Sequence, residues 1–331
     1  MGEIKLSPIL NENNKMPIAI DEVSKDSQGG TEKMKFALEK KISPELLDKF
    51  QIICSRVRDL DPDLKKIYWL HDLPEDPESA HLADGGWDKF DMCVFVSHWQ
   101  MNQYMHKFGI PWEKCRVLLN AIEPIDFKPK STVGPIKFIY HTTPHRGLEL
   151  LVPAFIRLCE IIPDQKFQLD VFSSFEIYGP SWVQRDEAYK NLFDICKDHP
   201  NINYHGFQPN DVVREALQEA HIFAYPSIWQ ETSCIALIEA MSAGCLCVHP
   251  DYAALPETSA NLNHTYHWDP DPQKHVMMFF SAMIRSTQVI HESNVRFSLE
   301  SVSNFVRSIY GWDRRINEWN NFLNSLLVEN K

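Results

Sequence analysis

The feature that most constrains this chain is a regular alternation of short apolar runs with stretches of helical periodicity. Apolar runs at residues 17–20, 51–54, 67–70 and 92–96 have the length of buried strands, and a helical pattern begins near Thr31. Alternation of this kind is typical of a parallel sheet covered by helices. We therefore predict a parallel α/β fold.

A proline-rich polar stretch over residues 123–135 interrupts the alternation and divides the chain into two doubly wound, Rossmann-like halves. The second half is expected to contain strands at 136–140, 167–172, 202–205, 221–225 and 245–248. Helices are expected at 148–161, 185–197, 210–219 and 232–243, and only helices after Pro270. The last of them has one apolar face, made by Ile316, Trp319, Phe322 and Leu326. The predicted boundaries are a tail at 1–15, a first domain at 16–125, a linker at 126–135, a second domain at 136–308 and a C-terminal helix at 309–331.

Composition narrows the class of protein. The 331 residues are 44% hydrophobic and carry 33 Lys and Arg against 45 Asp and Glu, a net charge of −12, which excludes a disordered or collagen-like chain. Without a basic run, bulk nucleic-acid binding is not expected. No apolar run reaches 18 residues and no signal peptide is recognised, so we expect a cytoplasmic protein without a transmembrane segment. The eight cysteines form no C-x-x-C pair, which favours buried free thiols over a metal site or disulfides.

Ligands of open α/β sheets bind at the carboxyl ends of the strands, so the loops that follow strands are the candidates for function. Gly29-Gly30 opens the first helix, where close backbone approach and free N–H groups suit a phosphate or sugar; a plain turn is the alternative. His71 follows a strand and is either a substrate ligand or a structural histidine. Arg146 precedes a helix N-terminus, a favourable place for an anion unless it is an ordinary surface arginine.

The segment from Pro226 to Gly244 is the most informative. Glu231 and Glu239 are separated by seven residues, and between them Thr232, Ser233, Cys234 and Ile235 bring backbone N–H groups to a helix start. This order suits a ribose, a diphosphate and a sugar held in sequence. An ordinary amphipathic helix is the alternative interpretation.

The ordered set of motifs over residues 16 to about 320 resembles the retaining family 4 glycosyltransferases of the GT-B fold. The matching segments are Gly29-Gly30-Thr31-Glu32, His71, Val96-Ser97, 119–123, 146–149, 205–207, Pro226-Ser227, Glu231-x7-Glu239 and 240–244. The resemblance implies two Rossmann-like domains that face a cleft, with the C-terminal helix crossing back to the first domain. It also implies a nucleotide-sugar donor in the second half and an acceptor in the first.

The resemblance also implies roles for individual residues. Glu239 would bind ribose hydroxyls, Glu231 the transferred hexose, and Arg146 the diphosphate in place of the family's usual lysine. Backbone groups of Thr232, Ser233, Cys234, Ile235 and Ala236 would line the diphosphate. Gly206 and Phe207 would pack against the base, His71 would lie beside the reacting sugar, and Gly29-Gly30 beside the phosphate and the acceptor.

The sequence departs from the family pattern at three places. His141 and Thr142 stand where an arginine is common, which leaves Arg146 as the diphosphate cation with His145 to assist; Ser233-Cys234 replaces Phe-Gly, and Ala253-Ala254 replaces Gly-Gly. Two alternatives therefore stay open. One is a non-catalytic nucleotide-sugar or glycan-binding module, and the other is a sugar-nucleotide epimerase of similar fold.

We expect a retaining, metal-independent hexosyltransferase that uses no cofactor. Its acceptor would be a hydroxyl of a glycan, lipid or small molecule, and peripheral membrane contact is open. Two Asp-Pro-Asp strings, at 61–63 and 269–271, are expected to form turns rather than a metal site. The sequence specifies neither the base, the sugar, the linkage nor the oligomeric state.

Overall fold

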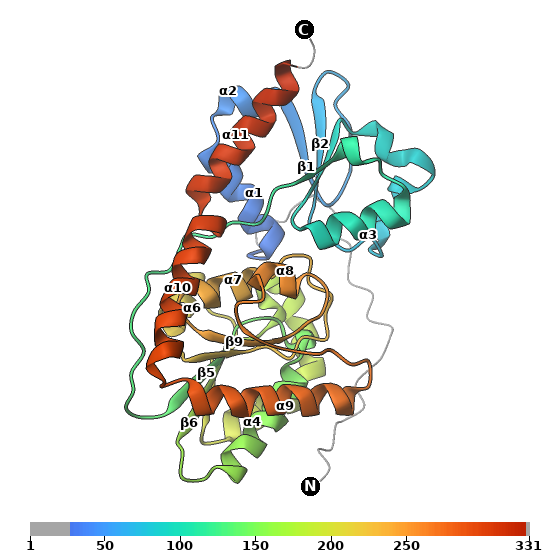
Figure 1. The fold of residues 1–331 in the computed structure, drawn as a ribbon. Helices are drawn as coiled ribbons and strands as arrows, with labels where there is room; N and C mark the ends of the chain where they lie inside the picture. Colours follow the sequence, from blue (N-terminus) through green and yellow to red (C-terminus); the bar gives the residue numbers. More distant parts are fainter. Residues whose placement is uncertain (1–26, 329–331) are drawn as a thin grey trace.

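The computed structural model describes residues 27–328. They form two parallel sheets, each with its own helices, and one lies above the other in Figure 1. We call the first sheet with its helices the N-terminal lobe and the second the C-terminal lobe. The strand expected at residues 17–20 and the tail expected at 1–15 lie outside the described residues.

The N-terminal lobe is a four-stranded sheet in the order β1-β2-β3-β4, all parallel. Its central strand β2 is buried on both faces, because Ile67 and Trp69 enter one apolar cluster while Tyr68 and Leu70 enter the other. The strands are β1 (Phe50–Cys54), β2 (Lys65–Leu70), β3 (Met92–Phe95) and β4 (Cys115–Val117). The helical elements are α1 (Gly30–Lys41), α2 (Pro44–Leu47), η1 (Pro77–Lys89), α3 (His98–Phe108) and η2 (Trp112–Lys114).

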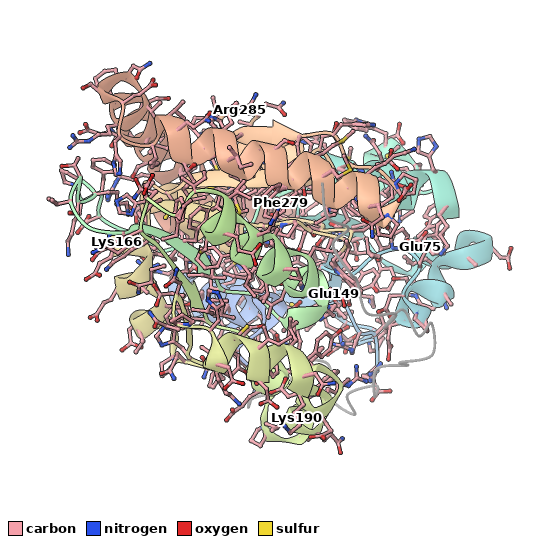
Figure 2. All side chains as sticks on the ribbon, turned by 90° about the horizontal axis from the view of Figure 1, so that it is seen from below. Glu75, Glu149, Lys166, Lys190, Phe279 and Arg285 are labelled. Carbon is pink, nitrogen blue, oxygen red and sulfur yellow. The ribbon has the colours of Figure 1, made fainter. Side chains whose placement is uncertain are left out.

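The C-terminal lobe is a six-stranded parallel sheet in the order β10-β9-β8-β5-β6-β7. Its strands are β5 (Ile136–Tyr140), β6 (Phe167–Val171), β7 (Ile202–Tyr204), β8 (Ile222–Ala224), β9 (Leu246–Pro250) and β10 (His264–Tyr266). Its helical elements are η3 (Pro144–Arg146), α4 (Leu148–Ile161), η4 (Phe175–Tyr178), η5 (Pro180–Tyr189), α5 (Lys190–Asp198), α6 (Asn210–Glu219), α7 (Ile235–Ser242), α8 (Leu255–Ser259), α9 (Pro272–Val289) and α10 (Ser293–Tyr310). Figure 2 views the lobe from below, where α9, with its buried Phe279, lies beside α4.

The strand order of the C-terminal lobe reverses between β5 and β8. The chain runs outward from β5 through β6 to β7, and then returns to the other side of β5 for β8, β9 and β10. Loops that leave the carboxyl ends of β5 and β8 therefore diverge to opposite faces of the sheet and open a crevice between them. The strand order therefore predicts a binding crevice where Arg146 and Glu231 follow their strands.

Two predicted helices begin later than expected. The helix expected at 232–243 starts at Ile235, because Thr232 bonds across to the N-terminal lobe, its hydroxyl donating to the carbonyl oxygen of His71 at 2.8 Å. The helix expected at 185–197 starts at Lys190, after the 3-10 segment η5. Asp186 in that segment accepts the N–H of Phe175 at 2.8 Å, which ties it to η4.

The last helix, α11 (Trp312–Val328), leaves the C-terminal lobe and runs along the N-terminal lobe (Figure 1). Trp319 is fully buried and meets Trp69 of β2 edge to face, with 4.8 Å between ring centroids. Phe322, Leu323 and Leu326 join the same apolar cluster of the N-terminal lobe. The predicted crossing of the C-terminal helix is therefore confirmed.

Truncating the central side chain of this contact tests how far α11 stabilises the N-terminal lobe. Trp319→Ala should lower the free energy of unfolding by about 3–5 kcal/mol, since it removes a fully buried indole and leaves a cavity. Urea unfolding followed by far-ultraviolet circular dichroism measures the difference. Phe297→Ala, at a side chain 72% exposed, is the control, and equal effects of the two substitutions would contradict the role given to α11.

Candidate active site

A buried ion pair joins the two loops at the reversal of strand order. Arg146, in η3 after β5, places Nη1 2.5 Å from Oε1 of Glu231, which follows β8. The hydroxyl of Tyr225, at the end of β8, donates to the same carboxylate oxygen. Glu231 is only 5% exposed, so this contact is formed away from bulk water.

The surroundings of the pair keep Arg146 charged and the Tyr225 hydroxyl protonated. Burial lowers the pKa of Arg146, but the Glu231 carboxylate more than offsets this and holds that pKa well above its ordinary value. Burial, followed by the nearby Glu231 charge, raises the pKa of Tyr225 well above its ordinary value, so its hydroxyl stays protonated and donates. Nη2 of Arg146 lies 3.5 Å from the hydroxyl of Tyr178, and Nε has no partner among the described residues.

Gly147 allows the two loops to meet. Its φ of +124° is unfavourable for other residues, and a Cβ there would lie 2.2 Å from the carbonyl oxygen of Pro226. Gly147 therefore lets the backbone after β5 pass close to the loop after β8, and this close approach brings the neighbouring Arg146 to that loop.

Glu239 lies one turn into α7 and is 6% exposed. Its Oε1 accepts a hydrogen bond from Nδ2 of Asn210 at 3.2 Å and lies 3.6 Å from Nη1 of Arg214, both on α6. Lys33 of the N-terminal lobe donates to Oδ1 of Asn210 at 2.9 Å. Gly206 and Phe207 occupy the loop between β7 and α6, immediately before this cluster.

The predicted N-terminal residues face these groups across the lobes. His71 follows β2, and its carbonyl oxygen accepts a hydrogen bond from the hydroxyl of Thr232. Nδ2 of Asn120 donates to the carbonyl oxygen of Ser233 at 3.2 Å. A Cβ on Gly30 would lie 3.2 Å from Cδ1 of Ile235. A Cβ on Gly29 would lie 2.6 Å from Oε2 of Glu32 and 3.3 Å from the ring of Tyr178. The structure therefore brings the predicted residues of both lobes together.

Three histidines at the site are neutral. Burial lowers the pKa of His71 to about 3, that of His141 to about 4 and that of His145 to about 3. His145 stacks on Phe175, with 5.2 Å between ring centroids, and meets Trp229 edge to face. The assistance expected from His145 is therefore limited to hydrogen bonding, since it adds no positive charge.

Many buried polar atoms around the crevice lack a hydrogen-bond partner within residues 27–328. They are His71 Nε2, Asp72 Oδ2, Asn120 Oδ1, His141 Nε2, Thr143 Oγ1, both ring nitrogens of His145, Arg146 Nε and Ser173 Oγ. Each such group costs about 1–3 kcal/mol when buried without a hydrogen bond. They follow β2, β4, β5 and β6, and their donors and acceptors suit a ligand rich in hydroxyl and phosphate oxygens.

Sequence reasoning missed several residues of the site. Asn210 and Arg214 lie one turn apart on α6, a spacing visible in the sequence once Glu239 is known to face that helix. Tyr225 and Tyr178 carry no sequence signal, and the place of Lys33 depends on how the lobes meet. Cys234, which the sequence placed beside the donor, immediately precedes α7 and is buried. Burial raises the pKa of its thiol well above the ordinary value.

In the described part of the chain, no group of His, Cys, Asp and Glu side chains is arranged to hold a metal ion. The eight cysteines all lie within residues 27–328 and form no disulfide bond there. Both Asp-Pro-Asp strings form turns as predicted: Asp61 accepts the N–H of Asp63 at 2.9 Å, and Asp269 accepts that of Asp271 at 2.8 Å.

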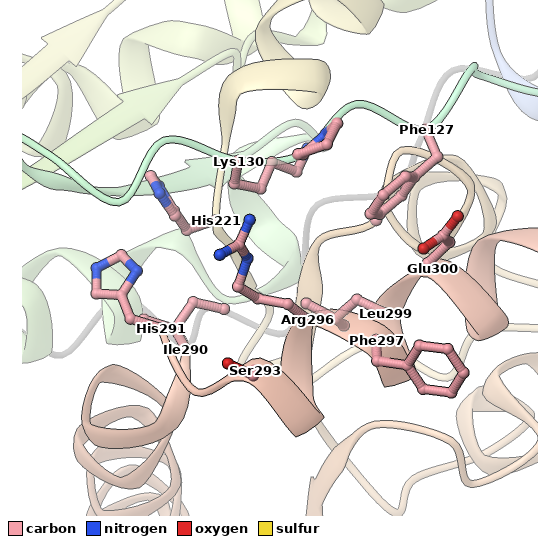
Figure 3. A pocket seen from close by; sticks show the side chains of 12 residues that line it. Phe127, Lys130, His221, Ile290, His291, Ser293, Arg296, Phe297, Leu299 and Glu300 are labelled. Carbon is pink, nitrogen blue, oxygen red and sulfur yellow. The ribbon is translucent and has the colours of Figure 1, made fainter.

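A separate pocket of about 280 Å³ lies near the junction of α9 and α10 (Figure 3). Its buried His221 accepts the N–H of Lys137 at 3.0 Å and donates to the carbonyl oxygen of Ser131 at 2.7 Å. Its Lys130 donates to the carbonyl oxygens of Leu217 and Gln218. Because these polar groups are already satisfied, the pocket contrasts with the crevice and is not the candidate site.

Comparison with known proteins agrees with the fold. Residues 136–285 match the model of a family described as glycosyl transferases group 1. One subunit of phosphatidylinositol N-acetylglucosaminyltransferase from Arabidopsis thaliana is 25% identical over 227 residues, which is 67% of this chain and 46% of that protein. The corresponding protein from Homo sapiens is 24% identical over 50% of this chain and 32% of its own length. The chain thus spans less than half the length of these relatives.

Solved structures show the same architecture. A glycosyltransferase from Rickettsia africae superposes with a TM-score of 0.63 at 15% identity, over 94% of this chain and 84% of that one. The pneumococcal O-GlcNAc transferase GtfA gives a TM-score of 0.58 at 13% identity, over 89% of this chain and 60% of its own. The expected GT-B fold is confirmed. Across residues 27–328, no helix has the length and apolar character needed to cross a membrane.

The neutral state of His145 predicts a pH dependence of stability. A histidine whose pKa is lowered on folding binds its proton more weakly in the folded chain, so it lowers stability as pH falls from 6.5 toward about 3. Relative to His145→Phe, which keeps a ring on Phe175, the wild type should lose up to about 1.4 kcal/mol per pH unit between roughly pH 6 and pH 4. Urea unfolding across that range measures this, and a difference that does not change with pH would contradict the buried, neutral imidazole.

Proposed function

We propose that this chain, a glycosyltransferase of the group 1 type by its C-terminal lobe, transfers a hexose from a nucleotide-diphosphate sugar to an acceptor hydroxyl. The observation that carries the proposal is the arrangement at the reversal of strand order. There Arg146 lies against Glu231, and Glu239 is one turn into the adjoining helix. A cation flanked by two buried carboxylates suits a diphosphate flanked by two polyhydroxylated groups.

Each part of the donor has a proposed partner. Glu239 binds the ribose hydroxyls and the Gly206-Phe207 loop packs against the base. Arg146 and the backbone groups from Thr232 to Ala236 hold the diphosphate, and Glu231 holds the hexose. Two sets of hydrogen-bond donors support this assignment, because both suit phosphate oxygens. They are Nε of Arg146, which has no acceptor among the described residues, and the backbone N–H groups at the start of α7.

The reaction requires stabilisation of the charge that develops on the departing diphosphate. We propose that Arg146 supplies it, in place of a metal ion. The acceptor oxygen attacks the anomeric carbon on the face from which the diphosphate leaves, and the diphosphate takes the acceptor proton. One carbon–oxygen bond forms, one breaks, and the anomeric configuration is retained. His71, neutral and beside the reacting sugar, exchanges hydrogen bonds with its hydroxyls.

The similar proteins suggest the first substrates to test. The Arabidopsis and human relatives are named for N-acetylglucosaminyl transfer to phosphatidylinositol, and the GtfA structure is that of a complex with UDP and GlcNAc. We therefore propose a UDP-linked hexose or N-acetylhexosamine as donor and include a lipid-linked polyol among the acceptors. A cytoplasmic location with peripheral membrane contact is part of the same proposal.

Nucleotide affinity tests the donor site. The purified chain is titrated calorimetrically with UDP, GDP, ADP and their common sugar conjugates. One nucleotide should bind, and Glu239→Gln should weaken it by roughly 10- to 100-fold, as expected for a lost hydrogen bond of about 1.5–3 kcal/mol to a charged group. Glu219→Gln, at an ion pair with Lys137 elsewhere on α6, should leave affinity unchanged. Unchanged affinity in Glu239→Gln would refute the ribose contact.

Turnover tests the leaving-group role. Arg146→Ala should lower kcat by about 10²–10³-fold, the cost typical of removing one donor that stabilises developing negative charge. Arg146→Lys, which keeps a cation beside Glu231, should retain more activity and separates catalysis from stability. Transfer is measured by release of the free nucleotide, and EDTA should leave the wild-type rate intact. A fully active Arg146→Ala enzyme would exclude Arg146 from the chemistry.

A further inference from the structure

A second carboxylate joins the two lobes, away from the proposed donor contacts. Glu257 of α8 in the C-terminal lobe accepts the backbone N–H groups of His98 and Trp99 at 2.8 Å each. Its Oε1 also lies 3.0 Å from Nδ1 of His98. These N–H groups are the first of α3 in the N-terminal lobe, where a helix leaves donors unpaired and favours negative charge. Glu257 therefore caps a helix of the opposite lobe.

The capped end of α3 holds the loop that carries His71. Gln100, in the first turn of α3, is fully buried. Its Nε2 donates to the carbonyl oxygen of Asp72 at 2.8 Å and to that of Leu70 at 3.3 Å, the residues on either side of His71. Its Oε1 accepts the N–H of Val96 at 2.9 Å. A shift of this helix end would therefore move His71 with it.

The segment that carries Glu257 begins at the donor site. The N–H of Ala254 donates to the carbonyl oxygen of Glu231 at 3.1 Å, and α8 follows directly. Thr232, next to Glu231, bonds the carbonyl oxygen of His71 from the other side. The contacts form a closed ring from Glu231 through Glu257, α3 and Gln100 to His71, and back through Thr232.

We infer that Glu257 is a positioning residue for sugar transfer, which holds α3 of the N-terminal lobe against the C-terminal lobe and so sets His71 opposite Glu231. The inference rests on the proposed function and extends it to a residue that touches neither donor nor reacting atoms. In the proposed function His71 contacts the hexose, whereas the groups that bind the nucleotide, apart from Gly29-Gly30 beside the phosphate, belong to the C-terminal lobe. Loss of the cap should therefore affect transfer far more than nucleotide affinity.

The test compares Glu257→Ala and Glu257→Asp with the wild type in three measurements. In Glu257→Ala, kcat should fall at least roughly tenfold, the factor that corresponds to about 1.4 kcal/mol and to loss of a single charge-assisted hydrogen bond. The calorimetric Kd for UDP should stay unchanged, and small-angle X-ray scattering should show a larger radius of gyration. Glu257→Asp keeps the charge on a shorter arm and should recover part of kcat.

Two control variants isolate the cap. His98→Ala removes the imidazole contact but keeps both backbone N–H groups, so its kcat should fall less than that of Glu257→Ala. Glu219→Gln removes a carboxylate whose ion pair lies within the C-terminal lobe and should change neither kcat nor the radius of gyration.

The outcomes that overturn the inference are distinct. Unchanged kcat in Glu257→Ala would refute it, and so would parallel loss of kcat and UDP affinity, which would mean that Glu257 only supports the loop below Glu231. A wild type that binds no nucleotide would instead contradict the proposed function. The scattering comparison then still decides whether Glu257 joins the lobes, with an unchanged radius of gyration as the refuting result.

Discussion

The buried ion pair of Arg146 and Glu231 is the interaction on which the rest of the site depends. It joins the loops after β5 and β8, the two strands between which the order of the sheet reverses. A buried charge is tolerated only with a well-placed partner, since removal of either one leaves an uncompensated charge that costs about 3–5 kcal/mol. Tyr225 adds a third group to the pair, and Gly147 permits the backbone approach. Loss of Arg146 or Glu231 would therefore leave the other charge buried without its partner at the crevice.

The two lobes are joined by contacts of different physical character at their two ends. Away from the crevice, α11 buries Trp319, Phe322 and neighbouring apolar residues against the N-terminal lobe. At the crevice the contacts are polar, between Thr232 and His71, Asn120 and Ser233, and Glu257 and α3. A single hydrogen bond contributes only about 0.5–1.5 kcal/mol net because water replaces it readily. The apolar end is therefore the permanent attachment, and the crevice end is the one able to exchange its contacts with a ligand.

Much of the fold follows from periodicity, because buried strands and amphipathic helices need only local patterns. The predicted helices at 148–161 and 210–219 coincide with α4 and α6, and the apolar face of the last helix predicted its buried side. The start of α7 was placed three residues too early, because Thr232 bonds to a residue 161 positions away. The contacts of Glu257 with α3 and of Lys33 with Asn210 likewise join residues more than 150 positions apart. Local patterns carry no information on such pairs, so the ordered motifs predicted which loops meet but not these bonds.

The arrangement of charge around the proposed donor links catalysis to closure of the lobes. Arg146 is balanced by Glu231, and His141 and His145 are neutral, so the C-terminal lobe alone offers little net positive charge to a diphosphate. Lys33 comes from α1 of the other lobe and reaches Asn210 beside Glu239 only because the lobes are in contact. Under the proposed function, contact between the lobes therefore brings a second cation to the ribose end of the donor, beside Glu239. Exclusion of water from the donor would depend on the same contact.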